Sequence, residues 1–466
     1  MEKKKNIIAP AAFIVASLFL FNPNVNIVDL LPDFIGYIIL YTSLSKVADL
    51  VPHFDEARDR FHKLFWITLS KIPAMFIMLS ISSQYTAEKP IIAVFSLTYA
   101  IIELIYIYPA FNSFYDGLEY LEERFGTDDG KPLPLPPRKF TAVFFSIKML
   151  GCTLPEFALT SVSDILGDVT YKPNIATFYP LLSAFSAIIV FGFGIVFLVK
   201  FIKFINCVSI SKPIEFSLSS SYLEKRERLA QIYSFRFVCL SMSLLTFATL
   251  FGADLFIDNK NMLPDIFSAL LFLASAGVMK RFSSRAKLPI ILSIFYAFSS
   301  LCTTFAQSNF VNNYDYMDIS KITAAKRCYD LVIASSAIEF LFLSLTLLSF
   351  AYCLSDAVKK TTGSPNANES AQKYNNELHR SFKVQSFIMA IFGMIASAST
   401  VVYIYLLSYT ERVAVLPEYS DVEVTMQKYG EFWIVVAILC IVWLVYTYRL
   451  AHAVKEAAEA RFEIDN

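Results

Sequence analysis

The sequence predicts an all-α integral membrane protein: a polytopic bundle of about twelve transmembrane helices, arranged as two six-helix halves related by internal duplication. Of the 466 residues, 56% are hydrophobic and only 17% are charged, whereas a soluble domain usually carries about 25% charged residues. The apolar residues gather in runs of about 20, which is the helix length needed to cross about 30 Å of hydrocarbon. Similar segments also recur in the two halves of the chain.

The repeat is clearest where "LPDFIGYIILYTSLSKV" begins at Leu31 and "LPDIFSALLFLASAGVM" begins at Leu263, 232 positions later. The same shift relates "ASLF" from Ala16 to "ATLF" from Ala248. Further along, "RKFTAVFFSIKMLG" matches "RSFKVQSFIMAIFG", and "AIIELIYI" matches "SAIEFLFL". Apolar strings align easily by chance, so the shared Pro, Asp, Glu and Gly residues carry the argument. We therefore predict a duplication.

Twelve apolar segments are predicted in order. They cover residues 7–22, 31–50, 61–82, 91–121, 140–163 and 176–206, and then 232–254, 263–282, 287–308, 328–357, 381–408 and 429–456. The expected domains are a first membrane repeat (1–208), a cytoplasmic connector (209–230), a second repeat (231–458) and a cytoplasmic tail (459–466). The opening pair of segments is short. It either spans on a thin or tilted path or forms a hairpin that does not fully cross.

Basic residues favour the cytoplasmic side of a membrane, and here every second loop is basic. The basic loops begin with residues 3–5 and include residues 58–63, 124–139, 225–228, 280–287 and 359–360. This alternation predicts a plasma membrane protein with both termini in the cytoplasm. Six spans per half would insert the two halves the same way up, related by an axis along the membrane normal.

Four ionisable residues fall at mid-depth in the predicted segments: Lys71, Glu103, Lys148 and Glu339. A charge at the bilayer centre costs about 2.5–3.5 kcal/mol on insertion scales. One interpretation is a buried cluster that binds a polar substrate or relays protons. The alternative is structural: Lys71 and Glu103 neutralise each other across adjacent helices, or each Glu stays protonated and donates to a hydroxyl on its own helix.

Proline residues stand next to both lysines. Pro155 cannot donate to the carbonyl of Gly151, so we expect the helix to open between Lys148 and Glu156. Broken helices beside ionisable groups form binding sites in transporters. The alternative is an ordinary kink, with Glu156 at the outer headgroups.

Pro73 stands beside Lys71 in the same way. The residues that align with the two lysines in the second half are Phe295 and Ala390. Substrate binding is therefore expected to favour the first half.

The repeated "LPD" places Asp33 and Asp265 at the start of the second and eighth segments, at the expected outer surface. A carboxylate there faces the positive end of a helix, and Pro fits the first turn. Helix initiation explains both residues, and an outer gate is the functional alternative.

No enzyme signature is present. The chain lacks G-x-x-x-x-G-K-[ST], H-E-x-x-H and G-x-S-x-G, which speaks against a built-in ATPase, a zinc hydrolase and a serine hydrolase. We therefore expect no catalytic residues, no metal and no cofactor. The formal net charge of zero provides no field for nucleic acid. The expected partners are the lipid bilayer and an unidentified small molecule.

The predicted function is secondary transport, or flippase-like transport, of a polar or anionic substrate by alternating access. Lys71 and Lys148 would neutralise an anionic group at a midplane site between the halves. The alternative is a non-transporting scaffold or sensor subunit. The organisation is similar in outline to that of major facilitator transporters. The loop "SKVADLVPHFDEARDRFHK" lacks that family's glycine-framed acidic and basic pattern, so the similarity is one of architecture.

Overall fold

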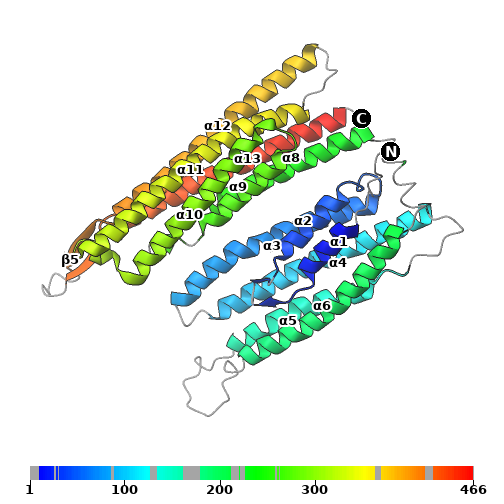
Figure 1. Ribbon diagram of the computed structural model, residues 1–466, viewed down its shortest axis with the longest axis horizontal. Helices are drawn as coiled ribbons and strands as arrows, with labels where there is room; N and C mark the ends of the chain where they lie inside the picture. The colour runs from blue at the N-terminus through cyan, green and yellow to red at the C-terminus, as the bar shows by residue number, and fades with distance from the viewer. Residues whose placement is uncertain are drawn as a thin grey trace. The chain divides into compact units, whose positions relative to one another are not determined.

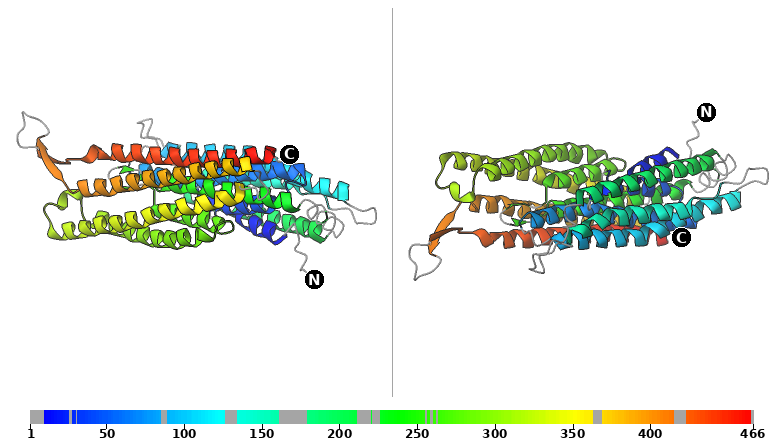
Figure 2. Two further views of the ribbon diagram at one scale, coloured as in Figure 1. Left: turned by 90° about the horizontal axis from the view of Figure 1, so that it is seen from above. Right: turned by 90° about the horizontal axis from the view of Figure 1, so that it is seen from below.

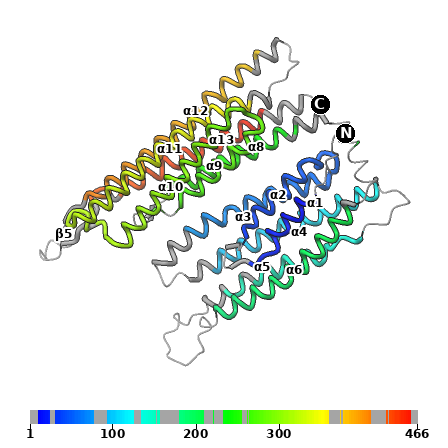
Figure 3. The backbone as a smooth tube through the Cα atoms, in the orientation of Figure 1, coloured from blue at the N-terminus to red at the C-terminus, as the bar shows by residue number. Residues whose placement is uncertain are grey.

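The computed structural model describes residues 10–25, 28–29, 31–84, 89–125, 134–160, 179–210, 220, 226–254, 256–257, 260–261, 263–362, 369–414 and 423–464; Figure 3 draws the others in grey. The chain divides into two compact units, Met1–Tyr233 and Ser234–Asn466, here called the first and second units. Most of the expected connector, residues 209–230, lies outside the described residues.

The described residues of the first unit form six helices and one small hairpin (Figure 1). In order, they are α1 (Pro10–Leu20), β1 (Asn24–Val25), β2 (Val28–Asp29), α2 (Asp33–Leu44), α3 (Pro52–Gln84), α4 (Lys89–Phe125), α5 (Arg138–Thr160) and α6 (Tyr179–Ile210). Each helix packs against the next, and α1 also packs against α6. The six helices therefore close into a ring.

An aromatic core holds the first unit together. The ring of Phe111 on α4 lies 5.3 Å from that of Phe61 on α3 and 5.1 Å from that of Phe145 on α5. It also contacts Phe197 and Phe201 on α6. Aromatic pairs at these separations add specific geometry to the apolar packing, so one residue joins four helices.

The described part of the second unit also contains six α-helices. Its elements are α8 (Arg226–Phe251), β3 (Phe256–Ile257), β4 (Lys260–Asn261), α9 (Asp265–Met279), η4 (Ser284–Ala286), α10 (Lys287–Asn313), η5 (Tyr316–Asp318), α11 (Thr323–Thr362), α12 (Glu369–Leu406), β5 (Thr410–Ala414), β6 (Glu423–Gln427), η6 (Gly430–Phe432) and α13 (Trp433–Ile464). Within each unit the helices run alongside one another (Figure 2). In the second unit α11 is central, since it contacts α9, α10, α12 and α13.

Gly393 allows α12 to approach its neighbours closely. A Cβ atom at this position would lie 2.6 Å from Leu347 on α11 and 2.7 Å from Trp443 on α13. Small residues commonly allow such close approach between membrane helices. The Trp443 side chain is fully buried there.

The described residues contain twelve α-helices, each on one of the predicted segments. Seven contain stretches long and apolar enough to cross a membrane: 93–124, 179–208, 234–251, 284–313, 323–358, 376–406 and 433–457. The helices α1, α2 and α9 are apolar but shorter, with 11, 12 and 15 residues. These lengths and compositions are those of a multi-pass helical membrane protein.

The two units share a local pattern at their beginnings. Hairpin β1–β2 and hairpin β3–β4 pair in the same register, Asn24 with Asp29 and Phe256 with Asn261. The positions differ by the same 232 that separates the two "LPD" sequences. After each hairpin an extended proline precedes a helix that begins at an aspartate, either Asp33 or Asp265.

Candidate functional site

Asp33 and Lys148 form a fully buried ion pair in the first unit. The Lys148 Nζ atom lies 2.6 Å from Oδ2 and 2.8 Å from Oδ1 of Asp33, and both side chains are 0% exposed. The ammonium also donates to the carbonyl of Leu20 at 3.1 Å, and the Asn22 amide donates to Asp33 at 3.3 Å. We expected this carboxylate at the outer surface, and that prediction was wrong. Asp33 is buried because its side chain pairs with Lys148 on α5.

A second ion pair joins α3 and α4. The Lys71 Nζ atom lies 2.6 Å from Oε1 of Glu103, with side-chain exposures of 7% and 1%. This is the mutual neutralisation that the sequence left open as the structural alternative. A buried charge is tolerated when a partner compensates it. In the first unit, both intramembrane lysines thus have a carboxylate partner.

The proline residues do not break their helices. Helix α5 continues through Pro155 and α3 continues through Pro73, so the expected opening beside Lys148 is absent. The hydroxyl of Ser186 on α6 donates to the carbonyl of Gly151. A neighbouring helix thereby supplies the donor that Pro155 lacks. The side chain of Glu156 lies outside the described part of the structure.

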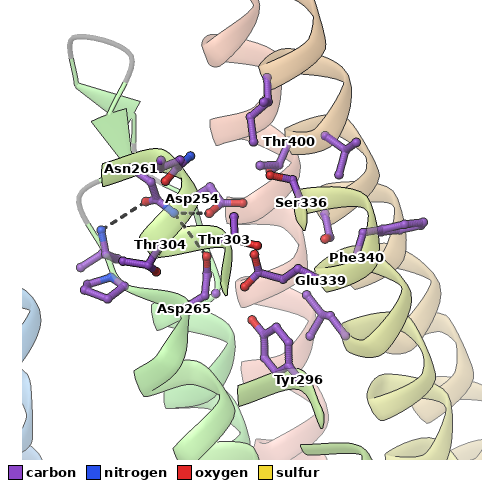
Figure 4. Close-up of a pocket in the computed structure, with 18 residues that line it drawn as sticks. Asp254, Asn261, Asp265, Tyr296, Thr303, Thr304, Ser336, Glu339, Phe340 and Thr400 are labelled. Carbon is purple, nitrogen blue, oxygen red and sulfur yellow. Dashed lines mark hydrogen bonds between the residues drawn. The ribbon is translucent and has the colours of Figure 1, made fainter. Parts of the chain in front are cut away.

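The second unit contains a polar cavity of about 100 Å³. Its lining residues come from helices α9 to α12, from the β3–β4 hairpin and from the residues that follow α8 (Figure 4). The polar lining residues are Asp254, Asn261, Asp265, Tyr296, Thr303, Thr304, Gln307, Ser336, Glu339, Ser397 and Thr400. No Lys, Arg or His is among the described residues that line it.

Three carboxylates point into this cavity, from Asp254, Asp265 and Glu339 (Figure 4). The Asn261 amide donates to Asp254 and, at 3.5 Å, to Asp265. Asp265 interacts electrostatically with both of the other acids. Like charges this close disfavour full ionisation of all three groups unless protons or a cation compensate them.

Glu339 is the least satisfied of the three acids. Glu339 is only 9% exposed, and its Oε1 atom has no hydrogen-bond partner within the part of the chain that the structure describes. The hydroxyls of Ser300 and Thr303 lie close enough to interact with the carboxylate, but no bond geometry satisfies Oε1. A buried polar atom in this state marks a place for a ligand, a water or an ion.

Corresponding positions explain why the two units differ. The 232 shift relates Asp33 to Asp265 and Asn22 to Asp254. Asp254 was not among the predicted site residues, although the same shift pairs it with Asn22, which donates a hydrogen bond to Asp33.

The aligned lysine positions hold Ala390, which is buried in the core, and Phe295, which is half exposed and stacks on Phe342. The second unit thus has acids at the positions aligned with Asp33 and Glu103 but no lysine at the positions aligned with Lys148 and Lys71. The lysines that suggested binding in the first half are already paired, and the carboxylate cavity lies in the second unit.

The oxygen-rich lining of the cavity in the second unit can hold a cation through carboxylates, hydroxyls and amide oxygens. Within the described ranges, no three His, Cys, Asp or Glu side chains gather in an arrangement that could hold a metal ion. Comparisons with protein families, with curated proteins and with solved structures find no match.

Proposed function

We propose that this chain is a secondary transporter whose substrate site is the carboxylate cavity of the second unit. The observation that carries the proposal is Glu339, a nine-tenths buried carboxylate. Among the residues that the structure describes, one of its oxygens has no hydrogen-bond partner and no basic residue lines its cavity. Ionisable groups inside membrane bundles are costly and usually serve ion or substrate pathways. In a protein without such a function, replacing these acids with apolar residues would increase stability.

The two units are proposed to be products of one duplication that insert the same way up. The matching hairpins, the Pro–Asp helix starts and the shift of 232 support this. The alternation of basic loops supports a plasma membrane location with both termini in the cytoplasm.

The first unit is then proposed to be the structural half of the transporter. Its two lysines hold Asp33 and Glu103, which leaves the anion-binding role expected for Lys71 and Lys148 without support from these contacts. The acids of the second unit favour a polar substrate that carries positive charge. No catalytic step is proposed for the chain.

Solvent access to the cavity tests the proposal without knowledge of the substrate. The Ser336→Cys variant places a thiol in the cavity, and Ser349→Cys places one on the same helix away from it. Both parent residues are 5% exposed, so burial is matched. Right-side-out and inside-out vesicles are treated with a membrane-impermeant methanethiosulfonate, and labelled peptides are identified by mass.

Alternating access predicts that position 336 is labelled from both sides of the membrane, in different fractions of the molecules. Position 349 is expected to react from at most one side. Labelling of position 336 from one side only, or from neither, would contradict transport and favour the scaffold or sensor alternative. Mass mapping separates these positions from the seven native cysteines.

A further inference from the structure

The first unit shows how this fold coordinates an ammonium group. The Nζ atom of Lys148 donates to both carboxylate oxygens of Asp33 and to the carbonyl of Leu20. These acceptors match the three donors of a primary ammonium. The group is fully buried, so the protein supplies its entire coordination shell.

The corresponding acceptors are kept in the second unit. Asp265 corresponds to Asp33, and Gly252 corresponds to Leu20 by the same shift of 232. Both Asp265 and Gly252 line the cavity. The two residues at the positions that hold an ammonium in the first unit therefore border an open space in the second.

The cation itself is lost from the second unit. The position aligned with Lys148 is Ala390, which removes the ammonium and its four-carbon chain. Gly252 stands at the position of Leu20, and the Ser268 hydroxyl lies 2.9 Å from where a Cβ atom at Gly252 would be. Ala390 itself does not line the cavity. The cavity of about 100 Å³ exceeds the roughly 10–15 Å³ that one water requires, so a small organic cation fits.

The charge of the site changes in the same direction. Asn22, which donates to Asp33 in the first unit, is replaced by Asp254, which adds an acid. Glu339 adds another, with its Oε1 atom unsatisfied among the described residues. The second unit thus offers more negative charge than the first at a place where the internal cation is missing.

We infer that the cavity binds a small primary ammonium cation, with its nitrogen where the Lys148 ammonium lies in the first unit. The inference deepens the proposed function, on which it rests, by naming the chemical class of the substrate. Asp265 and the Gly252 carbonyl are the expected primary ligands, and Asp254 and Glu339 supply the remaining charge.

Binding of radiolabelled methylammonium to the purified full-length protein in nanodiscs tests the inference. A scintillation proximity assay should show saturable binding to the wild type. The isosteric variants Asp265→Asn and Asp254→Asn should each weaken binding at least tenfold. The control is Asp330→Asn, which changes an exposed acid of α11 outside the cavity lining and should bind like the wild type.

Competition distinguishes an ammonium site from a general cation site. Unlabelled methylammonium should displace the label, whereas tetramethylammonium has the same charge but no N–H donor and should not. Absence of saturable binding, equal binding by Asp265→Asn, or equal competition by tetramethylammonium would each overturn the inference.

The outcome is separate from that of the labelling experiment. If position 336 reacts from both sides but methylammonium does not bind, transport stands and the ammonium inference falls. If methylammonium binds but position 336 reacts from one side only, the ammonium site stands and the transport proposal falls.

Discussion

The ammonium of Lys148 lies 2.6 Å from the carboxylate of Asp33, and neither side chain is exposed. The two residues are 115 positions apart in the chain and belong to α5 and α2. The pair ties the short helix α2 and the β1–β2 hairpin into the first unit. Variants that break this ion pair, or the Lys71–Glu103 pair, test how much each pair contributes to stability.

Lys148→Met should destabilise the protein by about 3–5 kcal/mol, because it leaves the carboxylate of Asp33 buried without a partner. The double variant Lys148→Met/Asp33→Leu should recover most of the loss, since it removes both charges. Thermal unfolding in detergent measures the cycle. If the double variant is as unstable as the single one, the ion pair is not the source of the effect.

Glu103→Gln and Glu339→Gln make the same substitution at aligned positions, and only Glu103→Gln should lower the stability of the protein. Glu103→Gln strands the Lys71 ammonium, so it should lower stability by several kcal/mol. Glu339→Gln removes an unsatisfied acid, so it should leave the ligand-free protein unchanged or slightly more stable. Melting temperatures of the two variants, measured side by side, check this. Equal losses would mean that Glu339 has a compensating partner.

Ser186→Ala should cost about 1–3 kcal/mol, because the carbonyl of Gly151 then loses the donor that replaces the missing N–H of Pro155. Adding Pro155→Ala should recover the lost stability, since alanine supplies the backbone donor within α5. The Ser186→Ala effect should therefore nearly vanish in a Pro155→Ala background. Chemical unfolding of the four proteins of this cycle provides the measurement, and an unchanged effect of Ser186→Ala in that background contradicts it.

The contact between the first two helices of each unit tests the duplication. At Gly36, a Cβ atom would lie 2.8 Å from the Leu20 side chain and 2.9 Å from the Ala16 carbonyl. The corresponding pair in the second unit is Gly252 with Ser268, whose hydroxyl donates to the Ala248 carbonyl at 2.8 Å. In the first unit the glycine, Gly36, lies on the second helix of the pair, whereas in the second unit the glycine, Gly252, follows the first helix.

Gly36→Ser should therefore destabilise the first unit by about 1–3 kcal/mol through overpacking. The double variant Leu20→Gly/Gly36→Ser copies the second unit and should recover part of that loss. Thermal unfolding compares the two. A double variant less stable than the sum of its single changes would argue against equivalent helix contacts in the two units.

The helices could be predicted from local information. Long apolar runs and their spacing are properties of neighbouring residues, and every described α-helix falls on a predicted segment. The pairing of Lys71 with Glu103 was one of two open alternatives, because adjacent helices bring equal depths together. The hairpins β1–β2 and β3–β4 carried no signal that we used.

The partners of the buried charges required the folded arrangement. Lys148 was expected to act near Pro155 on its own helix, but the tertiary fold brings Asp33 on α2 to it. The cavity likewise depends on residues from five elements, whose convergence no local pattern describes. Residue type and hydropathy specify which segments enter the membrane; the choice of neighbour for each charge is made by long-range packing, where desolvation penalises every group left without one.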